Sequence, residues 1–532
     1  MTSFDLIFDD EMDTKLAEVY LKRKEFHGEG FPDNGNIIYD LYQNKIFESK
    51  YEEIEAIYED VNENAMKYFY LAQKIKENIQ LFCQLEFLIR KIPMDHVKNF
   101  DLELIRQKLI YHGMYEEAEY SFETKIVMSA HSPLASLGCV AQTNSSEVVI
   151  VSGAQTAVVC RLFVNLCHQV GLNFVKLCFL SNVDSVLFNR KPESDPLVYL
   201  DNISVLKNGC VGVVTGKGEV DSAVDTFLFA PKQFPWQVKR IFVQENILER
   251  FKKSMEWKTN VNKDVNELHK SCSVVYSYDS KLFLCEYAGD SKELGDVTLV
   301  EAYRTVKELI SLLKKLHPFC VSVWSTDVAE SNQIAHEVDA NIVWINGFGL
   351  FSNPKAAQAF YSIIHLQSYY LKNKNILTNV TEKNSENMKE LRKKLEEWCK
   401  FSKPSRQEKL FGFLQKVKPE WRVKFKSSGS SVDVGQKMCI TVRKPVGVIF
   451  KDLFCSDEIP DLIQYIVDGG AIYFRVSDNE SVYQEAVACN TDAGAKAPLF
   501  IEFTTEEIFY NVGQLHYTTK AIWTSIGTSF AN

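Results

Sequence analysis

Residues 147–180 read EVVIVSGAQTAVVCRLFVNLCHQVGLNFVKLCFL. The stretch opens with a short run of β-branched residues, continues into a longer segment of helical length, and returns to a second apolar run after Gly171. A glycine directly after a periodic segment is a common helix stop, because it takes the left-handed backbone without strain. Strand, helix and strand in this order predict a parallel α/β sheet.

Upstream of this unit the pattern is helical. Apolar residues recur at helical spacing within residues 64–91, at Tyr68, Leu71, Ala72, Ile75, Ile79 and Phe82. They predict one amphipathic helix with a single buried stripe, and more helix is expected through residue 120. The apolar run KIVM, from Lys125, predicts another strand. Because isolated helices of this length are marginal, we expect the N-terminal part to pack on the α/β core.

A second α/β stretch lies downstream, between residues 210 and 345. Short apolar runs predict strands, and periodic segments predict helices between them. The strands are expected at 210–214, 240–244, 273–278, 281–287, 296–303, 321–325 and 341–346, and the helices at 220–229, 247–255, 306–316 and up to about residue 338. Ser325–Asp327 supply N-cap candidates for the last of these helices.

Residues 371–435 differ in composition from their surroundings. They contain a charged helical segment at 386–400, a basic stretch at 403–426 and the sequence SSGSS at 427–431, which together are typical of a flexible linker. Beyond it, ITVRKPVGVIF (440–450) and AIYFRV (471–476) predict strands of a small α/β unit, with a helical run at 459–467 between them. So small a sheet would have an open edge, so we expect residues 436–532 to dock on residues 126–370 of this chain or a second copy.

Composition excludes several classes of protein. The chain has 532 residues and a net charge of −10, which argues against a general nucleic-acid binder. Its 13 cysteines include no Cys-x-x-Cys pair, so no zinc ribbon is indicated and no metal ligands are assigned. The acidic N-terminus is not that of a signal peptide, and no apolar stretch is long enough to span a membrane. We therefore expect a cytoplasmic location with free thiols and no membrane partner.

Several longer motifs resemble those of one enzyme family. VDANIVWINGFGLFSNP (338–354) resembles the aldehyde dehydrogenase strand that closes the active site, and 221–251 resembles the segment around that superfamily's nucleophile, down to the Val-Gln-Glu strand end. Residues 145–173 resemble its cofactor-domain strand and helix. VRKPVGVI (442–449) resembles a signature that normally precedes the first cofactor strand, and here it follows a complete first copy. DGGAIYFRVSDN (468–479) and KAIWTSIG (520–527) resemble further cofactor-domain strands.

A truncated second copy is a feature of the tandem family-16 aldehyde dehydrogenases, which this chain resembles most. The resemblance implies an α/β fold with a parallel-sheet cofactor-type domain and a catalytic-type domain. It implies that residues 1–205 form an N-terminal helical segment and a degenerate cofactor-binding-like domain, completed by about 346–370. Residues 206–345 would form the catalytic-like domain, 371–435 a charged linker, and 436–532 the truncated second repeat.

The resemblance also locates the catalytic positions, and the residues there have changed. Aldehyde oxidation needs a thiolate nucleophile, an oxyanion donor and a general base. The nucleophile position falls on Pro235, in Gln233-Phe234-Pro235, and the base position falls on Val205. The oxyanion asparagine is replaced by His131, which can still donate a hydrogen bond, although a structural or surface histidine is the simpler interpretation.

The cofactor positions are degenerate as well. The Lys-Pro-Ser-Glu that holds the adenosine ribose in the family is replaced by Val151-Ser152-Gly153-Ala154. The glycine-rich diphosphate turn falls near residues 189–194, which read NRKPES, and close phosphate approach normally needs glycine there. The Glu-x-Phe segment that holds the nicotinamide ribose places Lys292 and Leu294 at its two positions. We assign no catalytic residue and no cofactor.

These losses favour a non-catalytic protein that works by binding a protein partner or by scaffolding, with self-association as one form. Two alternatives stay open. The chain could be an NAD(P)-dependent aldehyde oxidoreductase with relocated groups, in which Cys210, Cys285 or Cys320 replaces the nucleophile, although cysteines in apolar strands are more often buried core residues. It could also be a small-molecule sensor that uses the old cleft. Nucleotide binding would separate the first hypothesis from both alternatives.

Overall fold

The computed structural model divides the chain into two compact units. Unit 1 comprises residues 1–364, 433–438 and 523–532, and unit 2 comprises 365–432 and 439–522. Within them the structure describes residues 61–114, 124–128, 134–142, 147–153, 155–180, 183, 197–261, 272–279, 281–288, 297–372, 429–434, 437–445, 448–451, 471–474 and 517–525.

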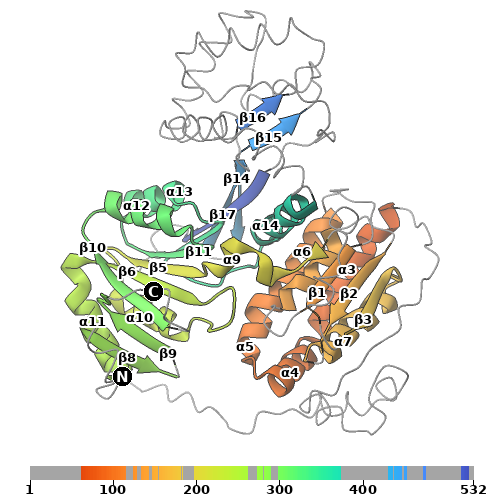
Figure 1. Ribbon diagram of the computed structural model, residues 1–532, viewed down its shortest axis with the longest axis horizontal. Coiled ribbons are helices and arrows are strands. Elements are labelled where there is room, and N and C mark those ends of the chain that lie inside the picture. Colours follow the sequence, from red (N-terminus) through yellow and green to blue (C-terminus); the bar gives the residue numbers. More distant parts are fainter. Residues whose placement is uncertain are drawn as a thin grey trace, which may run out of the picture. The chain divides into compact units, whose positions relative to one another are not determined.

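Helices precede the first sheet of unit 1, as the apolar stripe predicts (Figure 1). The single helix expected over 64–91 is two helices, because Asn78 interrupts it and its side chain donates to the Lys74 carbonyl at 2.8 Å. The elements are α3 (Val61–Glu77), α4 (Ile79–Arg90), α5 (Met94–His96), the π-helix η2 (Val97–Leu102) and α6 (Glu103–Met114). The stripe is buried except for the half-buried Ile79, and it packs on the α/β core, with the Tyr68 hydroxyl 3.4 Å from the Val140 carbonyl. The predicted packing of this region is thus confirmed for residues 61–114.

The unit quoted at the outset forms part of a four-stranded parallel sheet. Its order is β3-β2-β1-β4, and all three pairings are parallel. The elements are β1 (Thr124–Met128), the 3-10 helix η3 (Leu134–Gln142), β2 (Val148–Ser152), α7 (Ala157–Gln169), β3 (Val175–Phe179) and β4 (Leu197–Val198). Gly171 has φ +87° after α7, so the predicted helix stop is confirmed.

The second stretch forms a run of eight strands in the order β12-β11-β5-β6-β10-β9-β8-β7. The first six strands of this run, from β12 to β9, are parallel to one another. The pairings β9-β8 and β8-β7 are antiparallel, so the sheet is mixed. The strands are β5 (Cys210–Val214), β6 (Val238–Gln244), β7 (Asn260–Val261), β8 (Val274–Tyr278), β9 (Lys281–Cys285), β10 (Val297–Tyr303), β11 (Cys320–Trp324) and β12 (Ile342–Ile345).

Four helices lie between these strands at the predicted places: α10 (Val220–Phe229), α11 (Leu248–Lys258), α12 (Val306–Leu316) and α13 (Val328–Glu337). Two further helices were not predicted, the short α9 (Ser204–Lys207) before β5 and α14 (Pro354–Lys372) after β12. The expected N-cap of α13 is confirmed at Asp327. Both sheets together make the fold α/β, as the sequence predicts.

The C-terminal segments contain one correction. Residues 429–431, expected in a flexible linker, begin the strand β13 (Gly429–Val434). The β-branched Val432 and Val434 alternate with polar neighbours, and this period of two suits a strand better than the serine content suits a coil. The other strands are β14 (Lys437–Pro445), β15 (Val448–Lys451), β16 (Ala471–Phe474) and β17 (Tyr517–Ser525). β15 and β16 pair in parallel, and the helical segments expected at 386–400 and 459–467 lie outside the described residues.

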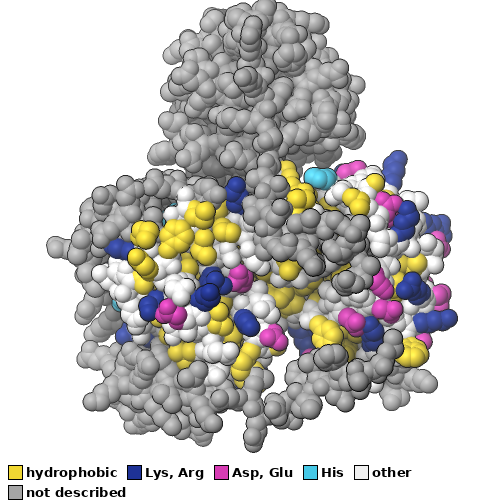
Figure 2. All heavy atoms as spheres, turned by 180° about the vertical axis from the view of Figure 1, so that it is seen from behind, with side chains coloured by type: hydrophobic (Ala, Val, Ile, Leu, Met, Phe, Trp, Pro, Cys, Tyr) yellow, Lys and Arg dark blue, Asp and Glu magenta, His cyan; other side chains and the backbone are white. Residues whose placement is uncertain are grey.

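Surface features of the described residues are unremarkable for a globular chain. On the face seen in Figure 2, side chains of both charge signs are interspersed with hydrophobic ones. Among the described helices, none combines the length and the apolar character that a membrane crossing requires.

Candidate active site

Pro235 lies just before β6, in a buried turn. The backbone amide of Trp236 donates to the Gln233 carbonyl at 3.0 Å, which closes this turn. The proline offers no hydroxyl, thiol or amine, so the position assigned to the nucleophile presents only a carbonyl oxygen as a reactive polar atom. That oxygen accepts a weak hydrogen bond from the Cys210 thiol at 3.8 Å.

Val205 lies on the short helix α9, half-buried. The structure brings its segment beside that of Pro235, because the Cys210 amide donates to the Gln237 carbonyl at 2.9 Å. Gly209, between them, has φ +65°, and a Cβ there would meet the Gln237 carbonyl oxygen at 2.8 Å. The two segments that the resemblance pairs as base and nucleophile are therefore hydrogen-bonded to each other, but neither the Val205 nor the Pro235 side chain can transfer a proton or attack a carbonyl.

Aromatic rings fill the space next to Pro235. Trp236 is fully buried, and its ring centroid lies 4.8 Å from Phe351, 5.2 Å from Phe319, and 5.6 Å from both Phe360 and Phe100. We call the set that these contacts connect the aromatic cluster; its members are Phe100, Trp236, Phe319, Trp344, Phe348, Phe351 and Phe360. The indole Nε1 of Trp236 is buried without a hydrogen-bond partner. Rings in contact at these distances leave the region beside residue 235 packed like a protein core.

The structure describes three of the four residues that replace the ribose-binding motif, Val151, Ser152 and Gly153, and none of them carries a charge. Val151, near the end of β2, is buried in a hydrophobic cluster with Val127, Val149 and Leu197. At the position that the resemblance matches to a ribose-binding lysine, this chain therefore has a buried side chain with no polar group. The other positions singled out in the sequence, His131, Ala154, Lys292 and Leu294, lie outside the described residues.

The cysteines considered as substitutes are core residues. Cys210, Cys285 and Cys320 are fully buried. Burial raises the pKa of Cys285 to about 12 and holds the pKa of Cys320 well above its usual range. A thiol in this environment stays protonated at neutral pH, and the thiolate is the reactive species. Among the described residues, no group of three or more His, Cys, Asp or Glu side chains is arranged to hold a metal ion.

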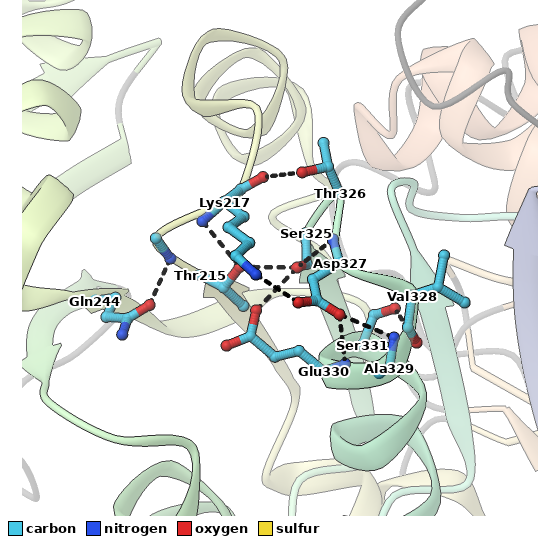
Figure 3. Close-up of polar contacts among 11 residues, drawn as sticks. Thr215, Lys217, Gln244, Ser325, Thr326, Asp327, Val328, Ala329, Glu330 and Ser331 are labelled. Atoms are coloured by element: carbon cyan, nitrogen blue, oxygen red, sulfur yellow. Dashed lines mark hydrogen bonds and ion pairs between the residues drawn. The ribbon is translucent and has the colours of Figure 1, made fainter.

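A polar network occupies the other end of the second sheet, where β5 and β11 end (Figure 3). The next strand along the chain, β6, lies on one side of β5, and β11 lies on the other, so the strand order reverses at this point. Open α/β sheets often bind ligands where the order reverses. The Thr215 hydroxyl donates to Ser325 Oγ at 2.9 Å, and Ser325 Oγ donates to Glu330 Oε2 at 3.0 Å. Both hydroxyls are fully buried, so a substrate could not reach them.

The rest of this network is also paired internally. Asp327 Oδ1 accepts from the backbone amides of Ala329 and Glu330 at 3.0 and 3.1 Å, and its Oδ2 accepts from Lys217 Nζ at 2.6 Å. The hydrogen bond from Lys217 lowers the pKa of the Asp327 carboxyl and raises the pKa of the lysine. The N-terminal amides of α13 that could hold an anion therefore already have a carboxylate, and sequence reasoning had found this residue only as a helix cap.

Comparisons with known proteins give structural likeness alone. No protein family model matches the chain, and no curated protein matches it. A point mutant of betaine aldehyde dehydrogenase from Staphylococcus aureus, solved in complex with NAD+, is similar at 16% sequence identity with a TM-score of 0.43, over 63% of this chain and 82% of that one. PnpE from Pseudomonas sp. WBC-3 is similar at 13% identity with a TM-score of 0.42, over 54% of this chain and 77% of that one.

Proposed function

We propose that this chain is a non-catalytic, aldehyde dehydrogenase-like protein that works by binding another protein or a second copy of itself. The observation that supports it best is the environment of Pro235. The residue is buried, and its neighbour Trp236 is held by four aromatic rings. A substrate that reacted at residue 235 would need open space beside it, and the described neighbours of Trp236 there are packed aromatic rings.

The chemistry leads to the same proposal. Aldehyde oxidation proceeds through a thiolate attack, hydride transfer to a nicotinamide cofactor and hydrolysis of the thioester. Proline cannot form the thioester, and valine at position 205 cannot activate the water. Loss of a covalent nucleophile alone typically costs about 10⁴-fold or more in rate. The buried thiols in the same sheet do not restore it, since burial keeps Cys285 and Cys320 protonated.

A binding role is consistent with what the chain retains. The strands, helix stops and helix cap of the fold persist, whereas the reactive positions have changed. Unselected decay would alter both alike, so we infer that the folded surface is what is still used. A nucleotide-binding sensor is the weaker alternative, because Val151 contributes to an apolar cluster where the family holds a ribose.

The first experiment tests catalysis. The full chain and its Pro235→Cys variant are assayed with short, long and aromatic aldehydes under NAD and NADP. We expect no turnover from either protein, because restoring the thiol does not clear the aromatic cluster. In the same samples, mass spectrometry of iodoacetamide-treated native protein should find the new cysteine unmodified, with denatured protein as the control. Turnover by the natural chain that disappears when one cysteine is replaced would contradict the proposal.

The second experiment tests binding. Calorimetric titration with NAD and with NADP should give no heat of binding, and a saturable signal would favour the sensor or the relocated enzyme instead. Sedimentation velocity over a range of protein concentrations tests self-association separately. A concentration-dependent increase in sedimentation coefficient supports a second copy as the partner, and a constant monomer value would assign the role to a different protein.

A further inference from the structure

The helix from α5 to α6 contains one element that sequence reasoning did not predict. Residues 97–102 form a π-helix, η2, between two α-helical segments. A π-helical turn is rare and costs hydrogen-bond geometry, and it recurs at functional sites and hinges. Two of its residues, Phe100 and Asp101, have surroundings that explain why the irregular turn is retained.

Phe100 connects η2 to the aromatic cluster. Its ring stacks on His96 at 5.2 Å on one side and contacts Phe351 at 5.4 Å and Trp236 at 5.6 Å on the other. Gly349 gives it room, because a Cβ at that position would meet the tip of the Phe100 ring at 2.5 Å. Phe100 is thus the one ring of the aromatic cluster that η2 supplies, and a movement of η2 would separate it from Trp236 and Phe351.

Asp101 belongs to a buried group of ionisable side chains that we call the acid–base cluster, consisting of Glu86, Arg90, His96 and Asp101. Arg90 Nη1 and Glu86 Oε2 form an ion pair at 2.8 Å, with both side chains at most 6% exposed. His96 Nε2 lies 3.9 Å from Asp101 Oδ2, beyond hydrogen-bond distance. His96 Nδ1 has no partner, and neither Asp101 oxygen makes a hydrogen bond of good geometry, although the backbone amides of Leu134 and Ala135 lie near enough to lower the Asp101 pKa somewhat.

Charge balance in the acid–base cluster determines where its protons are. Arg90 pairs directly with Glu86, although burial still raises the pKa of the Glu86 carboxyl. An ionised Asp101 would add a second buried carboxylate to this one described cation, which is costly. Among the described residues, Arg90 is the cation that acts on Asp101, and no second one does. The neighbouring ionisable groups are Cys83 on α4, with Asp95 and Lys98 within electrostatic range of it, Cys160 on α7, Tyr361 on α14 and Cys139 on η3. Helix α6 carries Arg106, which pairs with Glu103, and Lys108, which donates to Gln358.

The titration of the two unpaired members follows from burial. Burial and the nearby Glu86 raise the pKa of Asp101 to about 7, and burial and Arg90 lower the pKa of His96 to about 3. At weakly acid pH both side chains are therefore neutral while η2 is packed. In water both side chains are instead charged between about pH 4 and 6.5, because a carboxyl ionises near pH 4 and an imidazole is protonated below about pH 6.5.

We propose that η2 is a hinge latched by one proton, which Asp101 holds when η2 is packed and which His96 holds when η2 swings out and both groups meet water. The carboxyl O–H bond breaks on opening and an imidazole N–H bond forms, so Asp101 and His96 together take up or release no net proton between about pH 4 and 6.5. The proposal rests on the contacts of η2 and does not depend on the loss of catalysis.

The proton latch predicts opposite pH slopes for its two members. Asp101 binds more protons in the closed state, so its contribution to closure is lost as pH rises from its ordinary value to its raised one. His96 binds fewer protons in the closed state, so its contribution is lost as pH falls from about 6.5 towards 3. Each effect amounts to about tenfold in the opening constant per pH unit. In the natural chain these two slopes offset each other, and Glu86, whose pKa is raised by burial, is present in the natural chain and in both variants. Removing either latch group should therefore shift the pH dependence in the direction set by the other.

The experiment is hydrogen exchange with mass spectrometry on the full chain at pH 4.5 and 6.0, corrected for the intrinsic exchange rate. For peptides within 94–114, the pH dependence of the natural chain is the baseline, because the raised pKa of Glu86 can contribute to it. Relative to that baseline, the opening constant of Asp101→Asn should fall about 20-fold from pH 4.5 to 6.0, and that of His96→Gln should rise about 20-fold. Helix α12, whose buried residues are apolar, provides an internal reference within each sample.

Asp95→Asn is the matched control, because it makes the same chemical change on the neighbouring helix at an exposed position. It should behave like the natural chain. Shifts of the same sign relative to the natural chain in the two latch variants, or no shift in either, would overturn the proposal. If Asp101→Asn does not fold, His96→Gln alone tests the latch: an opening constant that does not rise with pH relative to the natural chain would contradict it.

Discussion

Asp327 caps the helix α13 at the end of the second sheet, and Asp101 lies within the π-helix η2. The two residues differ in how their carboxylates are paired. Asp327 accepts two backbone amide bonds and an ammonium bond, and these lower its pKa. Asp101 is fully buried, lacks hydrogen bonds of good geometry, and has a pKa raised to about 7. The polar network around Asp327 is complete by itself, whereas the acid–base cluster around Asp101 is left with uncompensated groups.

The difference separates two interpretations of a buried or half-buried polar group. A fully paired network fixes geometry, and every partner it could offer a ligand is already used. Unpaired buried polar groups raise the free energy of the packed state and are expected to have a reason to remain. On that basis the network at the end of β5 and β11 is structural, although it lies where strand order reverses, and the acid–base cluster is the place to look for movement.

The largest expected effect comes from breaking the only strong pair in the acid–base cluster. Arg90→Met keeps a long apolar side chain but leaves Glu86 buried without its cation. Removing one partner of a buried ion pair typically costs about 3–5 kcal/mol of unfolding free energy. Urea unfolding of the full chain at pH 7, followed by circular dichroism, measures the loss.

The double variant Arg90→Met with Glu86→Gln is the control for that measurement. It removes both charges, so its loss should be smaller than that of Arg90→Met alone, and the double-mutant cycle then isolates the ion pair. A double variant less stable than the single one would mean that the two side chains stabilise the fold by packing and not by their charges.

A smaller effect is expected in the paired network. Thr215→Val is nearly isosteric and removes the hydroxyl that donates to Ser325. Because Ser325 keeps its bond to Glu330, the expected loss is that of one net hydrogen bond, about 1 kcal/mol. Urea unfolding at pH 5 and pH 8 should give the same loss at both. A loss as large as that of Arg90→Met would erase the contrast between the two regions.

Most of the fold follows from local pattern, and the exceptions have physical reasons. The stripe at Tyr68–Phe82, the Gly171 stop and the Asp327 cap are each encoded within a few residues, so they could be predicted. The break at Asn78 depends on one side chain that competes for backbone hydrogen bonds, and a periodic pattern does not register it. Serines at 427–431 suggested a linker, but serine is permissive, and the valines that follow favour β13.

The candidate site also has a part that the sequence could predict and a part that it could not. The order of the motifs assigned Pro235 and Val205 to the nucleophile and base positions, and the segments that carry these two residues are hydrogen-bonded to each other in the structure. The aromatic cluster could not be predicted, because Phe100, Trp236 and Phe351 are far apart in sequence and meet only through tertiary packing. The acid–base cluster was equally hidden, since residues 86–108 show charged side chains throughout and nothing local indicates which of them are buried.

The last prediction compares the two aspartates directly, and it has the smallest expected effect. Asp327→Ala removes the cap of α13 and should lower the melting temperature slightly, because a helix start without its cap leaves amides unpaired. The carboxyl pKa of Asp327 is lowered in the folded state, so its stabilising contribution is complete above the ordinary pKa near 4 and is lost only as pH falls further.

The fall in melting temperature caused by Asp327→Ala should therefore be equal at pH 5 and pH 8. Asp101→Asn should behave differently over the same range, since the raised pKa of Asp101 costs more stability at pH 8 than at pH 5, and removing the carboxyl should stabilise the protein more at pH 8. Lys217→Ala, which leaves the cap in place and removes an exposed ion pair, should change the melting temperature less than Asp327→Ala does. If Asp327→Ala showed the pH dependence expected of Asp101→Asn, the hydrogen-bond pairing of the carboxylate would not be what distinguishes the two aspartates. The argument that the unpaired Asp101 is special would then be contradicted.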